Sequence, residues 1–287
     1  MEATELIKKV RRIEIKTRGL TRHIFAGEYH SAFKGRGIAF SEVREYQYGD
    51  DIRSIDWNVT ARFNHPYVRV YEEERELTVM LLIDVSGSGN FGTRVSFKRD
   101  LMTEIAAVLS FSAIFNNDKI GVIFFSDIVE KFIPPQKGRK HILRIIRELL
   151  DFRPASNNTN LREPLRFLTN GIKKRCTAFV ISDFIAPGFE EALRIAANKH
   201  DVVALKVSDP LEKRLPDVGL IKVADAESGL EQWIDTTSRH NRKVYEEWWL
   251  RHYEILSNTF RKCGVDFTEL STGEDYVKPL IKLFESR

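Results

Sequence analysis

The sequence predicts an α/β fold with a mostly parallel central sheet and helices on both faces. Three observations favour this fold class. From residue 77 onward, short apolar runs typical of buried strands alternate with longer stretches of helical periodicity. Such alternation favours parallel strands joined by crossover helices. The chain has 287 residues, with 43% hydrophobic and 30% charged side chains, which suits one large soluble domain with an appendage.

The predicted elements follow one another closely along the chain. Short apolar runs predict strands at 77–83, 120–125, 177–181, 202–207 and 265–270. Helical spacing of apolar residues predicts helices at 94–115, 138–150, 161–170, 188–199, 238–261 and 275–285. The apolar stretch 128–133 lies close enough to the strand before it to pair antiparallel. A hairpin is expected at 219–236. Gly264 is expected to end the long helix at 238–261 as its C-cap.

The first 76 residues have a different character. Residues 5–24 place apolar side chains at helical spacing with Lys8, Lys9, Arg11, Arg12, Lys16 and Arg18 between them, which predicts a basic amphipathic helix. Such a helix can lie on an anionic membrane, but packing on its own domain or on a partner is the interpretation we favour. Residues 26–76 are predicted to form a small β-containing module. We therefore expect residues 1–76 to pack on a main domain, 77–287, which carries the hairpin at 219–236.

Composition argues against several classes of protein. No apolar run approaches the ~18 residues that a membrane span needs, and the N-terminus lacks the apolar core of a signal peptide. Cys176 and Cys263 are too few for a disulfide framework. A net charge of +4 gives no strong indication of nucleic-acid binding. These features predict a cytoplasmic protein with no transmembrane segment and no nucleic-acid partner.

The most informative motif is Asp84-Val85-Ser86-Gly87-Ser88, which directly follows the first predicted strand. Ligands bind at the C-terminal ends of strands in open α/β sheets. The alternate residues Asp84, Ser86 and Ser88 can turn their oxygens toward one point. Because this set contains only oxygen ligands, it suits a hard divalent cation such as Mg²⁺, Mn²⁺ or Ca²⁺.

A second interpretation applies to the same stretch. Residues 87–92 read G-x-G-x-x-G between a strand and a helix, as in a dinucleotide-binding turn. Two features count against a nucleotide. The charge of Asp84 would face the pyrophosphate, which is repulsive. The ribose-binding acid is expected about 20 residues on, whereas the candidate, Asp127, follows Gly87 by 40 residues. The cation interpretation is therefore favoured.

Two further polar residues are expected at the same edge of the sheet. Thr159 lies in the polar loop before the helix at 161–170, and Asp183 ends the strand at 177–181. Because the C-terminal ends of neighbouring parallel strands share one edge, these oxygens are predicted to meet those of the Asp84 motif.

This combination resembles the von Willebrand factor A fold and its metal-ion-dependent adhesion site, over about residues 77–287. In that site D-x-S-x-S is followed by a loop Thr and a strand-end Asp. The resemblance implies that Asp84, Ser86, Ser88 and Thr159 bind a divalent cation, Mg²⁺ first and otherwise Mn²⁺ or Ca²⁺, and that Asp183 accepts a hydrogen bond from a bound water. Where the family usually has Gly before the loop Thr, this chain has Asn158, a residue that tolerates left-handed backbone.

A narrower resemblance covers nearly the whole chain. The segments that carry it are Gly35–Gly37, Phe40–Tyr46, Gly49–Trp57 and Glu72–Glu76. They are similar to the signature of domain-of-unknown-function family 58, in which this segment precedes a von Willebrand A-like domain. Members of that family are often encoded beside MoxR-type AAA+ ATPases. The resemblance therefore implies an adaptor or chaperone-like role with such an ATPase.

The chemistry of the motif points to binding rather than catalysis. Neutral hydroxyls are weak ligands, so a cation held by them keeps most of its charge and can accept an Asp or Glu carboxylate from a partner protein. No nucleophile or base accompanies the motif, so we expect no enzyme. A metal-free structural scaffold and, after it, a metal-dependent hydrolase remain as alternatives.

The acidic residues of the signature segment have a simpler interpretation than catalysis. Asp50, Asp51 and Asp56 stand near Arg53, with no histidine or nucleophile beside them. We expect them to form salt bridges that pin the small module to the sheet.

Overall fold

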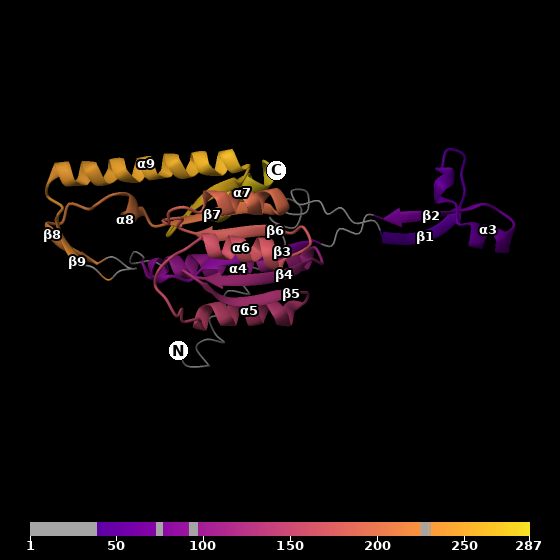
Figure 1. Ribbon diagram of the computed structural model, residues 1–287, viewed down its shortest axis with the longest axis horizontal. Helices are drawn as coiled ribbons and strands as arrows, with labels where there is room; N and C mark the ends of the chain where they lie inside the picture. The colour runs from indigo at the N-terminus through magenta and orange to yellow at the C-terminus, as the bar shows by residue number, and fades with distance from the viewer. Residues whose placement is uncertain (1–38, 73–76, 92–96, 225–228, 230) are drawn as a thin grey trace. The chain divides into compact units, whose positions relative to one another are not determined.

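The computed structural model describes residues 39–72, 77–91, 97–224, 229 and 231–287 (Figure 1). The chain divides into two compact units. The small unit lies within Lys34–Leu77, and the described residues of Thr78–Arg287 form the main unit. The amphipathic helix predicted at 5–24 lies outside the described residues. Within the described residues, no helix has both the length and the apolarity needed to cross a membrane.

A six-stranded sheet forms the centre of the main unit, with strand order β10-β7-β6-β3-β4-β5. The strands are β3 (Thr78–Asp84), β4 (Lys119–Phe125), β5 (Val129–Gln136), β6 (Thr177–Ser182), β7 (Asp201–Ser208) and β10 (Asp266–Ser271). All neighbouring strands are parallel except β4 and β5, which pair antiparallel. The predicted mostly parallel sheet, including the antiparallel pairing of the stretch at 128–133, is confirmed.

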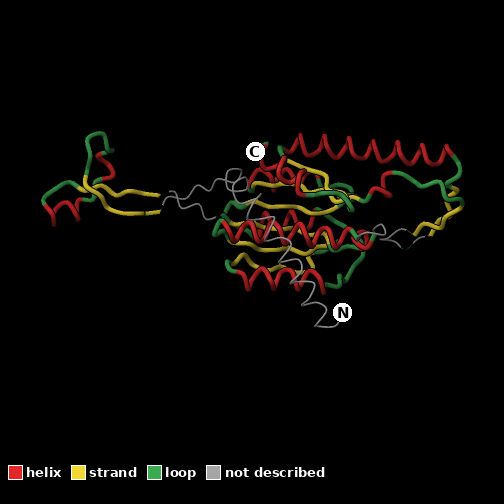
Figure 2. Tube along the Cα trace, turned by 180° about the vertical axis from the view of Figure 1, so that it is seen from behind, coloured by secondary structure: helices red, strands yellow, loops and turns green. Residues whose placement is uncertain are grey.

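Helices cover both faces of the sheet, as the alternation of elements predicts (Figure 2). The helices are α4 (Lys98–Phe115), α5 (Arg139–Asp151), α6 (Arg162–Gly171), α7 (Glu190–Lys199), α8 (Pro210–Lys213), α9 (Arg239–Cys263) and α10 (Val277–Glu285). Helices α6, α7 and α9 pack on one face, and α4, α5 and α10 pack on the other.

The alternation of side chains along the central strands explains why these segments are apolar throughout. Met80 and Leu82 of β3 pack in the core beneath α6, α7 and α9, together with Val180 of β6. The neighbouring Phe179 points to the opposite face and meets Phe284 of α10, with ring centroids 6.3 Å apart. A strand that buries both faces carries an almost continuous apolar run, and the ends of that run are where polar side chains first appear.

Helix α4 begins later than the sequence pattern predicts. We expected a helix from residue 94, and residues 94–96 lie outside the described residues. Phe97 has extended dihedral angles (φ −83°, ψ 152°), and the described helix starts at Lys98. The backbone N–H of Lys98 donates to the carbonyl of Phe91 at 3.0 Å, a non-helical hydrogen bond that holds the chain just before the first turn. The Lys98 side chain therefore lies at the N-terminal end of the helix.

The segment after β7 carries the smaller elements of the main unit. Strand β8 (Leu220–Ala224) pairs antiparallel with β9 (Glu231–Asp235). Helix α9 follows and ends at Gly264, whose left-handed backbone (φ 65°) closes the helix as a C-cap.

The small unit is held by its own ion pairs. It consists of β1 (Ala39–Glu45) and β2 (Tyr67–Glu72), paired antiparallel, a 3₁₀ turn (Ile52–Ser54) and α3 (Trp57–Phe63). Asp50 pairs with Arg44 at 2.7 Å, and Asp56 pairs with Arg69 at 2.8 Å. We predicted salt bridges that pin this module to the sheet, and this was wrong for both acids. Their partners lie within the unit, and Asp56 also caps α3 through the backbone of Asn58.

A buried histidine predicts how stability depends on pH. His141 is buried in α5 and donates from Nε2 to the carbonyl of Ile120 at 2.9 Å. Burial lowers its pKa, and the charge of Arg144 lowers it further. Because the unfolded chain binds this proton more readily, the free energy of unfolding should fall as pH drops below about 6.5, the ordinary His pKa.

Urea unfolding of wild type and His141→Gln at pH 7.5, 6.5 and 5.5 measures this effect. We expect the variant to lose less stability than wild type between pH 6.5 and 5.5. His240→Gln, at an exposed position of α9, is the control and should keep the wild-type slope. Equal slopes for all three proteins would contradict the role of His141.

Candidate functional site

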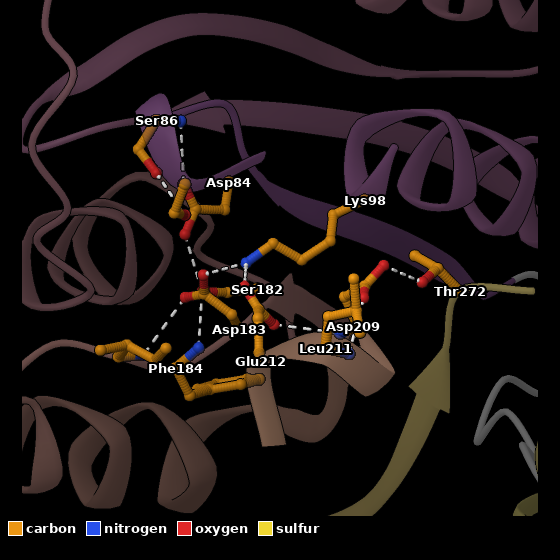
Figure 3. Close-up of polar contacts among 12 residues, drawn as sticks. Asp84, Ser86, Lys98, Ser182, Asp183, Phe184, Asp209, Leu211, Glu212 and Thr272 are labelled. Atoms are coloured by element: carbon orange, nitrogen blue, oxygen red, sulfur yellow. Dashed lines mark hydrogen bonds and ion pairs between the residues drawn. The ribbon is translucent and has the colours of Figure 1, made fainter. Parts of the chain in front are cut away.

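Asp84 ends β3 at the centre of the C-terminal sheet edge and is only 4% exposed. Its carboxylate accepts hydrogen bonds from neutral donors (Figure 3). The backbone N–H of Ser86 donates to Oδ1 at 3.0 Å, and the hydroxyl of Ser182 donates to Oδ2 at 2.7 Å. The first bond comes from the turn that follows β3 and the second from the end of β6, so the carboxylate links two neighbouring strand ends.

The two serines of the motif lie in contact with each other. Ser86 begins a 3₁₀ turn over Gly87–Asn90, and its hydroxyl lies 3.1 Å from that of Ser88. A hydrogen bond from the Ser88 side chain in turn stabilises the ionised form of Asp183. The alternate spacing of the motif therefore brings Asp84, Ser86, Ser88 and Asp183 into one hydrogen-bonded cluster, as predicted from their places at strand ends.

Asp183 differs from Asp84 because it has a charged partner. Its Oδ2 accepts a hydrogen bond from Lys98 Nζ at 2.9 Å, and its Oδ1 accepts one from the backbone N–H of Ile185 at 3.2 Å. Lys98 Nζ also donates to Glu212 Oε1 at 2.6 Å. The side chains are 1% (Lys98), 2% (Asp183) and 12% (Glu212) exposed, so these ion pairs are almost completely removed from water.

These environments push the pKa values of the two aspartates apart. Burial, together with the nearby charge of Asp183, raises the pKa of Asp84 to about 7. Burial also opposes ionisation of Asp183, but the Lys98 ammonium outweighs it and the pKa of Asp183 is lowered. Neighbouring buried carboxylates of which only one forms an ion pair, and whose pKa values therefore differ, are often found at functional sites.

Thr159 lies on a loop that is tied to the motif by hydrogen bonds. The backbone N–H of Gly87 donates to the carbonyl of Asn157 at 2.9 Å. Glu130 of β5 holds the same loop, because its Oε1 accepts from the backbone N–H of Ala155 at 2.9 Å. Thr159 Oγ1 is buried and has no hydrogen-bond partner among the described residues. The structure thus places the Thr159 loop beside the motif but does not hydrogen-bond its hydroxyl to the other four candidates.

The donor set fits a hard divalent cation in its chemistry. The five candidates offer two carboxylates and three hydroxyls, all oxygen donors. A buried hydroxyl without a partner is unusual, because buried polar groups are normally hydrogen-bonded. Among the described residues, no three His, Cys, Asp or Glu side chains are placed to hold a metal ion together. Cation binding at these five residues therefore stays a prediction. It requires the hydroxyls of Ser86, Ser88 and Thr159 as ligands in addition to the carboxylates.

Sequence reasoning missed Lys98 and Glu212. Lys98 carried a detectable signal, because it lies three and seven residues before Leu101 and Ile105 and so shares the buried face of α4. A lysine at a helix N-terminus is also unfavourable for the helix dipole. Glu212 completes a capping box with Asp209, a recognisable Asp-Pro-Leu-Glu pattern. Neither signal reveals that Glu212 and Lys98 meet.

Phe184, directly after Asp183, has a left-handed backbone (φ 57°) that a bulky side chain rarely adopts. Its N–H donates to Ser182 Oγ at 3.0 Å, and its ring packs against Phe260 with centroids 5.1 Å apart. Strained residues of this kind persist where their surroundings hold them, and they concentrate at functional sites. The packing of Phe184 therefore helps to set the position of the Asp183 carboxylate.

The structure also bears on the nucleotide interpretation. In dinucleotide-binding folds the helix opens at the glycine turn, so that its N-terminus meets the pyrophosphate. Here the turn is a 3₁₀ segment at Gly87–Asn90, whereas α4 starts only at Lys98. Asp84 lies buried at the base of the same turn. The cation interpretation therefore remains the favoured one.

Comparison with known proteins identifies the family. A model of the family described as protein of unknown function DUF58 matches residues 42–255. The chain belongs to this family. The uncharacterized protein Rv1480 of Mycobacterium tuberculosis (strain ATCC 25618 / H37Rv) is 32% identical over 288 residues, which cover 99% of this chain and 90% of the relative. The uncharacterized protein Mb1516 of Mycobacterium bovis matches to the same extent.

Solved structures share the fold at low sequence identity. An aerotolerance-related membrane protein from Bacteroides fragilis matches with a TM-score of 0.50 and 14% identity, over 73% of this chain and 97% of that one. BatB from Bacteroides thetaiotaomicron (TM-score 0.48, 16% identity, 73% and 98%) and the SpRpn10 VWA domain (0.40, 9%, 74% and 95%) are also similar. The predicted α/β fold with a mostly parallel central sheet is confirmed by the strand order, and the Bacteroides fragilis protein shares that fold.

Proposed function

We propose that this DUF58 protein is a cytoplasmic protein-interaction module that binds its partner through a divalent cation, with Mg²⁺ as the first candidate. The cation would be held by Asp84, Ser86, Ser88 and Thr159, with Asp183 accepting a hydrogen bond from a bound water. When bound, the cation would supply a positive centre for an Asp or Glu carboxylate of the partner.

The observation that carries this proposal is a charge imbalance at the sheet edge. Asp84, Asp183 and Glu212 bring three carboxylates to this edge, and Lys98 pairs with only two of them. The remaining one, Asp84, is buried with neutral donors alone. A buried carboxylate must take up a proton or gain a cation, and the unpartnered hydroxyl of Thr159 offers a further oxygen ligand nearby.

Calorimetric titration of Mg²⁺ or Mn²⁺ tests the metal half of the proposal. We expect a saturable heat for wild type and none for Asp84→Ala. Equal heats for the two proteins would contradict a cation at this site. Differential scanning calorimetry of both proteins without metal shows whether the variant is folded.

The identity of the partner rests on the family resemblance, and we propose a MoxR-type AAA+ ATPase in an adaptor role. Tagged protein purified from the native host in Mg²⁺ should enrich an AAA+ subunit, and Asp84→Ala should enrich it less. Recovery of the same proteins by both baits, without any AAA+ subunit, would contradict the adaptor role.

One observation favours a second candidate, a structural role without metal. The hydrogen bonds from Ser86 N–H and Ser182 Oγ to Asp84 already join the ends of β3 and β6. In that case Asp84 would act as a link between strands, and crystals soaked in Mn²⁺ would show no anomalous peak beside it. A peak there would exclude this candidate.

Substitution of Thr159 separates the two candidates without disturbing the fold. Because Thr159 Oγ1 has no hydrogen-bond partner among the described residues, Thr159→Val should change the stability of the metal-free protein by less than about 1 kcal/mol. If the hydroxyl binds the cation, the variant should bind Mn²⁺ about tenfold more weakly, a loss of ~1.4 kcal/mol.

The matched control is Ser112→Ala in α4, which removes another buried hydroxyl that lacks a partner in the described ranges of the chain. It should leave Mn²⁺ binding unchanged. Wild-type Mn²⁺ affinity in Thr159→Val would show that Thr159 is not a ligand.

A further inference from the structure

Lys98 and Lys206 are both only 1% exposed. Burying an ammonium group is costly unless it is paired, and each of these lysines is paired. Lys206 Nζ lies 2.9 Å from Glu269 and 5.0 Å from the ring centre of Trp249. Lys98 instead forms its ion pair with Asp183, one of the candidate cation-binding residues. The two lysines are thus a natural pair for comparison.

Lys98 neutralises only one of the two buried aspartates of the site. Both oxygens of Asp183 are engaged, one by the Lys98 ammonium and one by the N–H of Ile185. Asp84 receives hydrogen bonds only from neutral groups. An incoming cation would therefore find no competing positive charge at Asp84, whereas the water that Asp183 is proposed to hold would share that carboxylate with the buried Lys98 ammonium.

Glu212 fixes the ammonium in this place. Its Oε1 accepts from Lys98 Nζ at 2.6 Å, and its Oε2 accepts from the backbone N–H of Asp209 at 3.0 Å. Asp209 caps α8 through the N–H of Leu211 at 2.9 Å, so Glu212 is held by the first turn of that helix. Figure 3 shows Lys98 reaching between Asp183 and Glu212.

We propose that Lys98 is a specificity-determining residue that weakens binding of a divalent cation by itself and so makes tight binding depend on a carboxylate from the partner. The inference rests on the proposed function and deepens it. A fixed positive charge beside the site repels the cation and occupies Asp183. Because Lys98 neutralises Asp183, a carboxylate from the partner supplies the negative charge that the cation still needs.

The test measures Mn²⁺ affinity from the electron paramagnetic resonance signal of free Mn²⁺, with the full chain and four variants. Lys98→Met should bind Mn²⁺ at least about tenfold more tightly than wild type, because a repulsive charge is gone and Asp183 is released. Lys206→Met, the matched control, removes an equally buried lysine whose ammonium pairs with Glu269 and with none of the candidate residues. It should change the affinity by less than about twofold.

Glu212→Gln acts in the opposite direction. It removes a negative charge and leaves Lys98 to Asp183 alone, so Mn²⁺ binding should weaken about threefold or more. This variant keeps the inference testable if Lys98→Met does not fold, which a thermal melt shows. Wild-type or tighter binding in Glu212→Gln, or no gain in a folded Lys98→Met, would overturn the role of Lys98.

Acetate serves as the probe for the partner's carboxylate, with chloride at equal ionic strength as its control. Acetate should tighten Mn²⁺ binding in wild type more than in Lys98→Met. An equal effect in both proteins would overturn the inference. If neither wild type nor Lys98→Met binds Mn²⁺ more tightly than Asp84→Ala, the proposed function itself fails. If wild type binds in an Asp84-dependent way and Lys98→Met gains nothing, only the inference on Lys98 fails.

Discussion

Replacing Asp84 with Asn should make the metal-free protein more stable at pH 8 and abolish its stabilisation by Mg²⁺. The pKa of Asp84 is raised to about 7 by burial and by the charge of Asp183. A group whose pKa is higher in the folded than in the unfolded state favours folding at low pH, and that contribution is lost as pH rises through the folded value. At pH 8 the ionised Asp84 therefore opposes folding.

The size of this effect follows from the two pKa values. A change from 3.8 to about 7 corresponds to roughly 4 kcal/mol at pH 8. Asn is neutral, but its single oxygen cannot accept well from both Ser86 N–H and Ser182 Oγ, which costs about 1 kcal/mol. We therefore expect Asp84→Asn to be more stable than wild type by about 2–3 kcal/mol at pH 8 and to show no gain at pH 4.5.

Urea unfolding in EDTA and in Mg²⁺, at pH 8 and pH 4.5, gives the measurement. Mg²⁺ should stabilise wild type at pH 8 and leave Asp84→Asn unchanged, because a ligand stabilises only the state that binds it. Asp127→Asn, at the end of β4 and outside the cluster, is the control and should respond to Mg²⁺ as wild type does. A variant less stable than wild type at both pH values would show that Asp84 supports the fold as a link between strands.

The fold and the main members of the site could be predicted because they depend on local patterns and one rule of topology. Apolar runs mark β3 and β6 as strands buried on both faces. Asp84 and Asp183 then follow as the first acidic residues at their C-terminal ends. Since parallel strands end at the same edge, their proximity needs no knowledge of side-chain packing.

The features that could not be predicted are set by contacts between distant parts of the chain. Lys98 and Glu212 are 114 residues apart. Lys98 begins α4 and Glu212 belongs to the capping box of α8, and no sequence periodicity relates these two positions. The first residue of α4 is set by a hydrogen bond from the N–H of Lys98 to the carbonyl of Phe91. Ion-pair partners in the small unit were mispredicted for a similar reason, because composition shows that charges will pair but not with which residue.

A substitution in β4 tests whether the close packing of β4 against β5 is needed to hold the loop of Thr159. Gly121 lies in the interior of β4, where a Cβ atom would meet Met80 Sδ at 2.8 Å, the Ile133 carbonyl oxygen at 2.9 Å and Pro135 N at 2.9 Å. Two of these atoms belong to the backbone of β5, which cannot move without changing its pairing with β4. Gly121→Ala should therefore lower the free energy of unfolding by about 3 kcal/mol, at the upper end of the usual cost of overpacking.

Gly171→Ala is the matched control for this prediction. A Cβ at Gly171, in the last turn of α6, meets only the Phe167 ring at 3.5 Å, an ordinary contact. The control should be neutral or more stable by up to ~1 kcal/mol, because Ala favours helix. Urea unfolding followed by circular dichroism compares the two, and equal stabilities would show that β5 can shift at no cost.

The same substitution should reach the candidate site through Glu130. This residue lies on β5 and holds the loop of Thr159 through the N–H groups of Ala155 and Ser156 at 2.9 and 3.3 Å. If Gly121→Ala displaces β5, the loop moves with it, and Mn²⁺ affinity should fall while that of Gly171→Ala stays at the wild-type value. A destabilised Gly121→Ala that binds Mn²⁺ as wild type does would show that the loop keeps its position independently of β5. The hydrogen bonds from Gly87 N–H to the Asn157 carbonyl and from Asn160 N–H to the Ser126 carbonyl would then be the contacts that place Thr159.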